Sequence, residues 1–339
     1  MAIMTRLKLT ISMPIVLALV ACGIDQGGGP APEQVTQTAA VTYGPIDDFG
    51  SIVLNGETIG TVTASILVNG MPASEVDLNV GQVVRVDSLI DNSVSTATLV
   101  QYQANVIGPM TAIDAQMGVL TVLGQTIDTD AATELNLPGV ASLVDIPVDT
   151  VVEVSGLSRP DGSLLATYLG TPAAINQFSI GTAVTAVDLA GMQFTVGGIL
   201  VDYSQAAIID LIGGQPAAGQ IVLVIGSTFG NAGELIAEQV LQLGVEPGIF
   251  SLLDTDLANS SVAASQVGDS VGFQANFIGF IETSNNATTL TINNVFVSFD
   301  AATSIVGGAA SDLNVGVLVQ ITGDVANPGS VTATEILIL

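Results

Sequence analysis

Apolar and polar residues alternate along most of the chain in short runs rich in β-branched residues, such as Val83–Val86 and Val119–Val122. A period of two is typical of strands with one buried face, whereas a helix buries residues with a period near 3.6. Helical patterns are sparse, and the stretches that follow Asp130, Asp202 and Asp300 predict no more than one turn, with the aspartate as its cap. The pattern therefore predicts an all-β protein.

Four windows of the chain repeat one order of features, which begins with a short apolar or aromatic lead into a glycine. The four opening glycines are Gly44, Gly108, Gly181 and Gly279. A predicted hairpin follows in each window, with turns that include Asn55-Gly56, Gly197-Gly198 and Asn293-Asn294. Asn and Gly tolerate the positive φ that tight hairpin turns require.

A second landmark follows each hairpin at a steady distance, at Gly81, Asp149, Gly219 and Gly316. Each opens a β-branched run, and a closing strand then starts near Ala97, Ala166, Ala237 and Ala333. The sequence Asp-Ala-Ala-Thr also recurs, at 130–133 and 300–303. Three landmarks held in register four times indicate a repeat of about 60 residues.

Short strands in units this small favour closed or nearly closed sheets, because closure removes exposed edges. We therefore predict tandem small, partly open β-barrels that resemble OB-like modules, with β-sandwich repeats as the alternative fold. The predicted modules span 41–103, 104–170, 171–243 and 275–339. Residues 244–274 fall outside the register and are predicted to be a linker or an extra hairpin.

The N-terminus predicts an exported lipoprotein. Arg6 and Lys8 precede a short apolar stretch, too short for an ordinary membrane-spanning helix, as in a signal peptide over residues 1–21. The segment Leu19–Cys22 resembles the bacterial lipobox, which implies cleavage before Cys22 and a diacylglycerol on its thiol. The Gly- and Pro-containing residues 22–40 predict a flexible tether. Gly23 after the cysteine favours the outer membrane, by resemblance to enterobacterial sorting.

The charge is strongly one-sided, with 31 acidic residues, 4 basic residues and no histidine in the chain. Removal of a signal peptide over 1–21 leaves Arg85 and Arg159 as the basic residues. Such a surface repels nucleic acid and anionic head groups, so no nucleic-acid partner is expected.

Several segments of the chain resemble domain-of-unknown-function family 5666. They are Gly44–Gly56, Val80–Val86 and Leu120–Ile127, and the resemblance covers residues 41–170 best. It implies an exported protein, with a signal peptide or lipobox, built from repeated β-rich units. It implies no reaction and brings no catalytic residues, because its phrases are turn-and-strand patterns.

The residues that remain for chemistry are carboxylates, because the processed chain has no histidine or lysine and its one cysteine is predicted to carry lipid. Adjacent Asp47 and Asp48 would face opposite sides of a strand. The pairs Asp128 with Asp130 and Asp254 with Asp256 have oxygen ligands that suit Ca²⁺, but we interpret them first as solvated acids at strand ends. We therefore predict no catalytic, cofactor-binding or metal residues.

Two classes of function remain open. The first is a non-enzymatic lipoprotein of the cell envelope, held in the outer membrane by lipid on Cys22, whose β-repeats contact an envelope protein or an extracellular polymer. The second is a carboxylate-dependent envelope hydrolase, which requires two acids that converge in one pocket. The sequence shows no such pair, so we favour the first.

Overall fold

The computed structural model describes residues 37–243, 273–327 and 329–339. The predicted signal peptide, Cys22, nearly all of the tether and the pair Asp254 and Asp256 lie outside these ranges. So does most of the predicted linker at 244–274.

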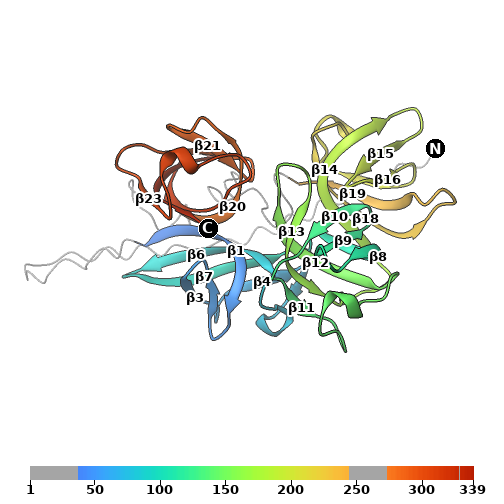
Figure 1. Cartoon of the computed structure of the whole chain (residues 1–339), viewed down its shortest axis with the longest axis horizontal. Helices are drawn as coiled ribbons and strands as arrows, with labels where there is room; N and C mark the ends of the chain where they lie inside the picture. Colours follow the sequence, from blue (N-terminus) through green and yellow to red (C-terminus); the bar gives the residue numbers. More distant parts are fainter. Residues whose placement is uncertain (1–36, 244–272, 328) are drawn as a thin grey trace, which may run out of the picture. The chain divides into compact units, whose positions relative to one another are not determined.

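The described chain consists of strands joined by turns and by short 3₁₀ segments of three residues, and it divides into four groups with the same order of elements (Figure 1). The first group contains β1 (Thr38–Asp48), β2 (Ile52–Leu54), β3 (Glu57–Gly60), β4 (Ser65–Val68), β5 (Met71–Ala73), the 3₁₀ segment η1 (Glu75–Asp77), β6 (Val83–Asp91) and β7 (Val94–Tyr102).

The other three groups repeat this order without the strand that corresponds to β5. The second contains β8 (Val106–Asp114), β9 (Val119–Val122), β10 (Gln125–Asp128), β11 (Glu134–Asn136), η2 (Leu143–Asp145), β12 (Val151–Ser158) and β13 (Leu164–Gly170). The third contains β14 (Phe178–Asp188), β15 (Gln193–Val196), β16 (Ile199–Asp202), β17 (Ala207–Ile209), η3 (Ile212–Gly214), β18 (Ile221–Phe229) and β19 (Leu235–Gln242). The fourth contains β20 (Phe273–Ser284), β21 (Thr289–Ile292), β22 (Val295–Ser298), β23 (Ser304–Val306), η4 (Ala310–Asp312), β24 (Leu318–Asn327) and β25 (Ser330–Ile338).

Each group closes into a small barrel. In barrel 1, β1 pairs with β2 and β2 with β3, β3 runs parallel to β7, and β7 pairs with β6, which returns to β1. The same ring of five pairings recurs in barrels 2, 3 and 4. Figure 1 shows the red ribbon of barrel 4 as a ring. The prediction of tandem small β-barrels is therefore confirmed, and the structure does not adopt the sandwich alternative.

The hairpin turns follow the predicted chemistry. Both turn residues have positive φ in every barrel, as in Asn55 (51°) with Gly56 (76°) and Asn293 (52°) with Asn294 (62°). Barrel 2 uses Leu123 in the same conformation, at 48°. A β-bulge lies opposite each turn, in the first strand of the barrel. The bulge bends that strand so that the ring can close.

The second landmark residue makes the same backbone hydrogen bond in every barrel. The backbone N–H groups of Gly81, Asp149, Gly219 and Gly316 each donate to the first strand of their own barrel over 2.8 Å. All four residues have positive φ, between 68° and 85°. Asp149 takes the place of a glycine because a short polar side chain tolerates this conformation better than most residues.

The structure corrects one landmark of the predicted repeat. Val84, Val152 and Val319 pair with the opening glycines Gly44, Gly108 and Gly279, but the equivalent Val222 pairs with Thr182, not with Gly181. Glycine is needed at this place when the turn residue has a side chain. A Cβ on Gly44 would lie 2.4 Å from Asn55 Oδ1, and one on Gly108 would lie 2.4 Å from Leu123 Cγ.

In barrel 3 the turn residue is the glycine, and the strand residue beside it has a side chain. Its turn residue, Gly197, has no side chain, and the strand position below the turn holds Thr182 in place of glycine. Sequence alignment on glycine therefore shifted the opening of the third window by one residue.

Two strand pairings join the barrels. Residues 39–43 of β1 run parallel to residues 273–277 of β20, which links barrel 1 with barrel 4. Ile107 and Val106 of β8 pair with Ser179 and Ile180 of β14, which links barrel 2 with barrel 3. Barrels 2 and 3 also share one continuous hydrophobic cluster. The cluster of barrel 4 includes Val41, Tyr43 and Val83 of barrel 1, and most of the remaining core of barrel 1 forms a separate cluster.

Candidate functional site

A buried carboxylate lies where barrel 2 contacts barrel 1. Glu153 of β12 is only 5% exposed, and its carboxylate accepts hydrogen bonds from three side chains of barrel 1. Tyr102 Oη donates over 2.8 Å, Gln82 Nε2 over 3.2 Å and Asn69 Nδ2 over 3.5 Å. We call these four residues the Glu153 cluster.

Burial dominates the electrostatics of this cluster. It raises the pKa of Glu153 above the usual glutamate value, although the three donors act in the opposite direction. Burial also raises the pKa of Tyr102 well above its usual value, and the neighbouring Glu153 carboxylate adds to that rise. The tyrosine is therefore neutral, and its hydroxyl group donates a hydrogen bond to the carboxylate.

Further contacts between barrels 1 and 2 surround the cluster. The Val83 amide donates to Ser155 Oγ over 2.9 Å, and Asn136 Nδ2 donates to Asn79 Oδ1 over 3.0 Å. A Cβ on Gly81 would lie 2.4 Å from the Thr167 carbonyl oxygen, so the backbones of the two barrels approach closely there.

The contact between barrels 1 and 4 is built from amides at the equivalent place. Gln320 occupies the position of Glu153, because the two residues pair with Ile278 and Ile107, each next to an opening glycine. Gln320 Nε2 donates to Asn276 Oδ1 over 2.9 Å and to the Asn55 carbonyl oxygen over 3.2 Å. We call Asn55, Asn276 and Gln320 the amide cluster.

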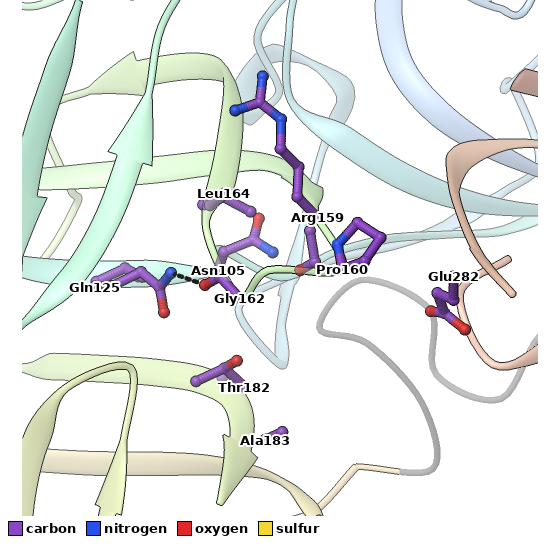
Figure 2. Close-up of a pocket in the computed structure, with 12 residues that line it drawn as sticks. Asn105, Gln125, Arg159, Pro160, Gly162, Leu164, Thr182, Ala183 and Glu282 are labelled. Carbon is purple, nitrogen blue, oxygen red and sulfur yellow. Dashed lines mark hydrogen bonds between the residues drawn. The ribbon is translucent and has the colours of Figure 1, made fainter. Parts of the chain in front are cut away.

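A cavity of about 300 Å³ opens between barrels 2 and 3, with Glu282 of barrel 4 also in its lining (Figure 2). Asn105, Gln125 and Thr182 contribute polar groups from barrels 2 and 3. Burial raises the pKa of Glu282, and the backbone N–H of Asn294 donates to its carboxylate over 3.1 Å. Glu282 is the one carboxylate among the described lining residues, so these residues do not supply the converging acid pair that a glycosidase-type hydrolase uses.

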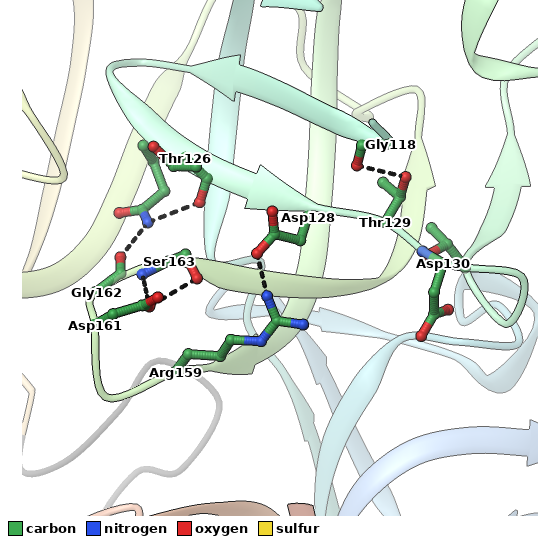
Figure 3. A network of polar contacts seen from close by, with 11 residues as sticks. Gly118, Thr126, Asp128, Thr129, Asp130, Arg159, Asp161, Gly162 and Ser163 are labelled. Atoms are coloured by element: carbon green, nitrogen blue, oxygen red, sulfur yellow. Dashed lines mark hydrogen bonds and ion pairs between the residues drawn. The ribbon is translucent and has the colours of Figure 1, made fainter. Parts of the chain in front are cut away.

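Arg159 also lines this cavity, but its guanidinium points away from it (Figure 2). It forms an ion pair with Asp128 (Figure 3). Its guanidinium carbon also lies 5.3 Å from the centre of the Phe280 ring. Arg159 therefore holds the 159–163 hairpin against β10 and stacks on barrel 4.

Two of the predicted aspartate pairs, Asp47 with Asp48 and Asp128 with Asp130, lie within the described residues. Asp128 faces Arg159, whereas Asp130 points elsewhere and accepts the Ala132 amide of its own turn over 2.8 Å (Figure 3). Asp48 accepts the amide of Phe49 over 2.8 Å. Within the described ranges, no group of three or more Asp, Glu, Cys or His residues is arranged to hold a metal ion.

The Asp-Ala-Ala-Thr repeat forms one kind of turn at both places. Thr133 Oγ1 donates to the Ala166 carbonyl oxygen over 2.7 Å, and Thr303 Oγ1 donates to that of Ala333 over 2.9 Å. Asp130 Oδ1 and Asp300 Oδ1 each accept the backbone amide two residues later over 2.8 Å, so the recurrent aspartates shape the turns.

Sequence reasoning missed the Glu153 cluster, although one signal was present. Glu153 stands in the middle of the run Val151–Val154, where an acid interrupts three valines. Alternation with the inward-facing Val152 and Val154 puts it on the outer face of barrel 2, and its burial comes from barrel 1, which a local pattern does not show. The lipidation residue predicted from the sequence, Cys22, lies outside the described residues, and no described helix is long and apolar enough to cross a membrane.

Comparison with known families gives a clear relationship. The model of the family described as "Domain of unknown function (DUF5666)" matches residues 40–101, 107–169 and 278–336, which correspond to barrels 1, 2 and 4. The resemblance predicted for residues 41–170 is confirmed and extends to the fourth barrel. Barrel 3 has the same topology but lies outside the matched ranges. No curated protein matches the chain. Since the three matches cover more than half of its residues, the chain belongs to the DUF5666 family, as a protein with repeated copies of the domain.

Proposed function

We propose that this protein is a non-enzymatic lipoprotein of the cell envelope, anchored in the outer membrane through Cys22, whose barrels serve as a structural or interaction module. The observation that supports it best is the use of the polar side chains. Glu153, Gln320 and Arg159 engage other barrels, rather than converging around one cavity. A scaffold that presents its outer loops to a partner requires such fixed contacts.

The proposed partner is another envelope protein or an extracellular polymer. With 31 acidic and 4 basic residues in the chain, partners of the same charge are disfavoured. A neutral or basic protein, or an uncharged polysaccharide, fits this surface. Repeated barrels multiply the number of similar loops on one chain, which raises avidity for a polymer with repeated units.

The anchor is tested by expressing the chain in a bacterium that processes lipoproteins, beside Cys22→Ser. We expect the wild type to gain the mass of a diacylglycerol after loss of residues 1–21 and to enter the detergent phase. The variant should lack this mass and remain in the aqueous phase. An unlipidated wild type would overturn the proposed anchor.

The non-enzymatic character is tested separately with the cavity. Wild type and Glu282→Gln are compared on peptidoglycan and on chromogenic glycosides. Equal, background rates support the proposal. Hydrolysis by the wild type that disappears in Glu282→Gln would instead identify a carboxylate-dependent hydrolase.

A further inference from the structure

The Glu153 cluster is an unusual way to join two barrels. The carboxylate belongs to barrel 2, and the three hydrogen bonds described above come to it from barrel 1. Behind them, Asn69 Oδ1 accepts the Ala104 amide over 2.9 Å, so the donor nearest the edge of the cluster is itself held in place. The carboxylate is therefore closed off from water and depends on barrel 1 for its hydrogen bonds.

The charged and titratable groups around Glu153 do not neutralise it. Tyr102 on β7 and Tyr168 on β13 are its titratable neighbours, and both are neutral hydroxyl groups at moderate pH. Arg85 on β6 forms an ion pair with Asp87 at 2.8 Å. The two ion pairs found among the described residues, Arg85 with Asp87 and Arg159 with Asp128, both leave Glu153 out.

An ionised carboxylate in such a place is costly, because neutral donors offset only part of the lost hydration. A protonated carboxyl group removes that cost and keeps the contact, since Tyr102 Oη can accept its proton at the same 2.8 Å distance. The two protonation states of Glu153 thus differ in how well barrels 1 and 2 fit together.

We propose that Glu153 is a proton-sensitive clamp, which tightens the contact between barrels 1 and 2 in acidic surroundings and loosens it as the surroundings become alkaline. The direction follows from burial, which raises the pKa of Glu153 in the folded chain above the unfolded value near 4.5. The folded state then binds the proton more strongly than the unfolded state. The stabilisation is complete below the unfolded pKa and is lost as the pH rises through the folded pKa.

The amide cluster supplies the matched control. Gln320 stands at the equivalent strand position between barrels 4 and 1, but its amide does not titrate. Glu153→Gln should therefore remove a pH dependence, and Gln320→Glu should introduce one at the other contact.

The test measures the thermal midpoint of the full chain between pH 4.5 and 8, in detergent, for the wild type and both variants. The difference between wild type and Glu153→Gln matters, because it cancels the titration of the other acids. We expect the wild type to lose about 3 °C or more relative to Glu153→Gln over this range. Gln320→Glu should lose more than the wild type.

Hydrogen exchange locates the effect. The Val83 amide, which donates to Ser155 Oγ across the contact, should exchange faster at pH 8 than at pH 5 after correction for the intrinsic rate. In Glu153→Gln this increase should disappear. Tyr102→Phe, which removes the shortest hydrogen bond to the carboxylate, should steepen the pH dependence. Parallel pH profiles for wild type and Glu153→Gln, or unchanged exchange at Val83, would overturn the proposal.

Discussion

Barrel 1 meets barrels 2 and 4 with the same repeat position of each partner but with different chemistry. Barrel 2 offers the carboxylate of Glu153, which is 5% exposed, and barrel 4 offers the half-buried amide of Gln320. Both are outward-facing and stand third in the corresponding strand, β12 or β24. The comparison shows that the repeat fixes where neighbouring barrels touch, while a single substitution at that place decides whether the contact responds to charge.

The largest expected difference in stability between the two contacts comes from removing each side chain in turn. Glu153→Ala leaves the Tyr102 hydroxyl and the Gln82 amide buried without their acceptor and should lower the free energy of unfolding by about 3 kcal/mol. Gln320→Ala should cost about 1 kcal/mol, because its partly exposed partners can turn to water. Denaturant titration of both variants beside the wild type measures the two effects. A larger effect for Gln320→Ala would contradict the ranking.

Substitutions at two landmark glycines make the same kind of comparison, with a smaller expected effect on stability. Gly81 and Gly316 have φ values of 84° and 85°, but only Gly81 approaches another barrel, at the Thr167 carbonyl oxygen. Gly316→Ala should cost about 1 kcal/mol for the strained φ alone. Gly81→Ala adds a clash at the contact with barrel 2 and should cost about 2 to 3 kcal/mol.

Thermal and denaturant unfolding of these two alanine variants give the comparison directly. Equal losses would mean that barrels 1 and 2 can accommodate a Cβ at Gly81 without cost, which would contradict a close and rigid approach there.

The smallest expected effect concerns Asp149, the second landmark residue that is not a glycine. Asp149 has a φ of 68° and is exposed, and glycine adopts this conformation without steric strain. Asp149→Gly should therefore stabilise barrel 2 by about 0.5 kcal/mol, offset in part by the greater freedom of glycine in the unfolded chain. Asp149→Ala, which keeps the strain and loses the polar side chain, is the matched control and should destabilise.

The sequence predicted the repeated elements well because they depend on neighbours along the chain. These elements are local properties: turn residues with positive φ, the landmark glycines Gly81 and Gly219, and the alternation along the strands. The exception is barrel 3, where the strand position holds Thr182 and the turn residue is Gly197. Alignment on glycine therefore shifts the start of this repeat by one residue.

The contacts between barrels could not be predicted in the same way. Alternation shows that Glu153 faces outward, but not that barrel 1 covers it. Likewise, nothing in residues 39–43 indicates that β20 will lie beside β1, because that pairing joins segments at opposite ends of the described chain. The candidate site consists mainly of such contacts.

The parallel pairing of β1 with β20 has a consequence for synthesis. The backbone edge of residues 39–43 is made early, but its partner strand is translated only after barrels 2 and 3. Until β20 is made, barrel 1 has an open strand edge, and open edges recruit other chains. The order of translation thus makes barrel 4 a late cover for the edge of barrel 1, and chains truncated before β20 are expected to aggregate.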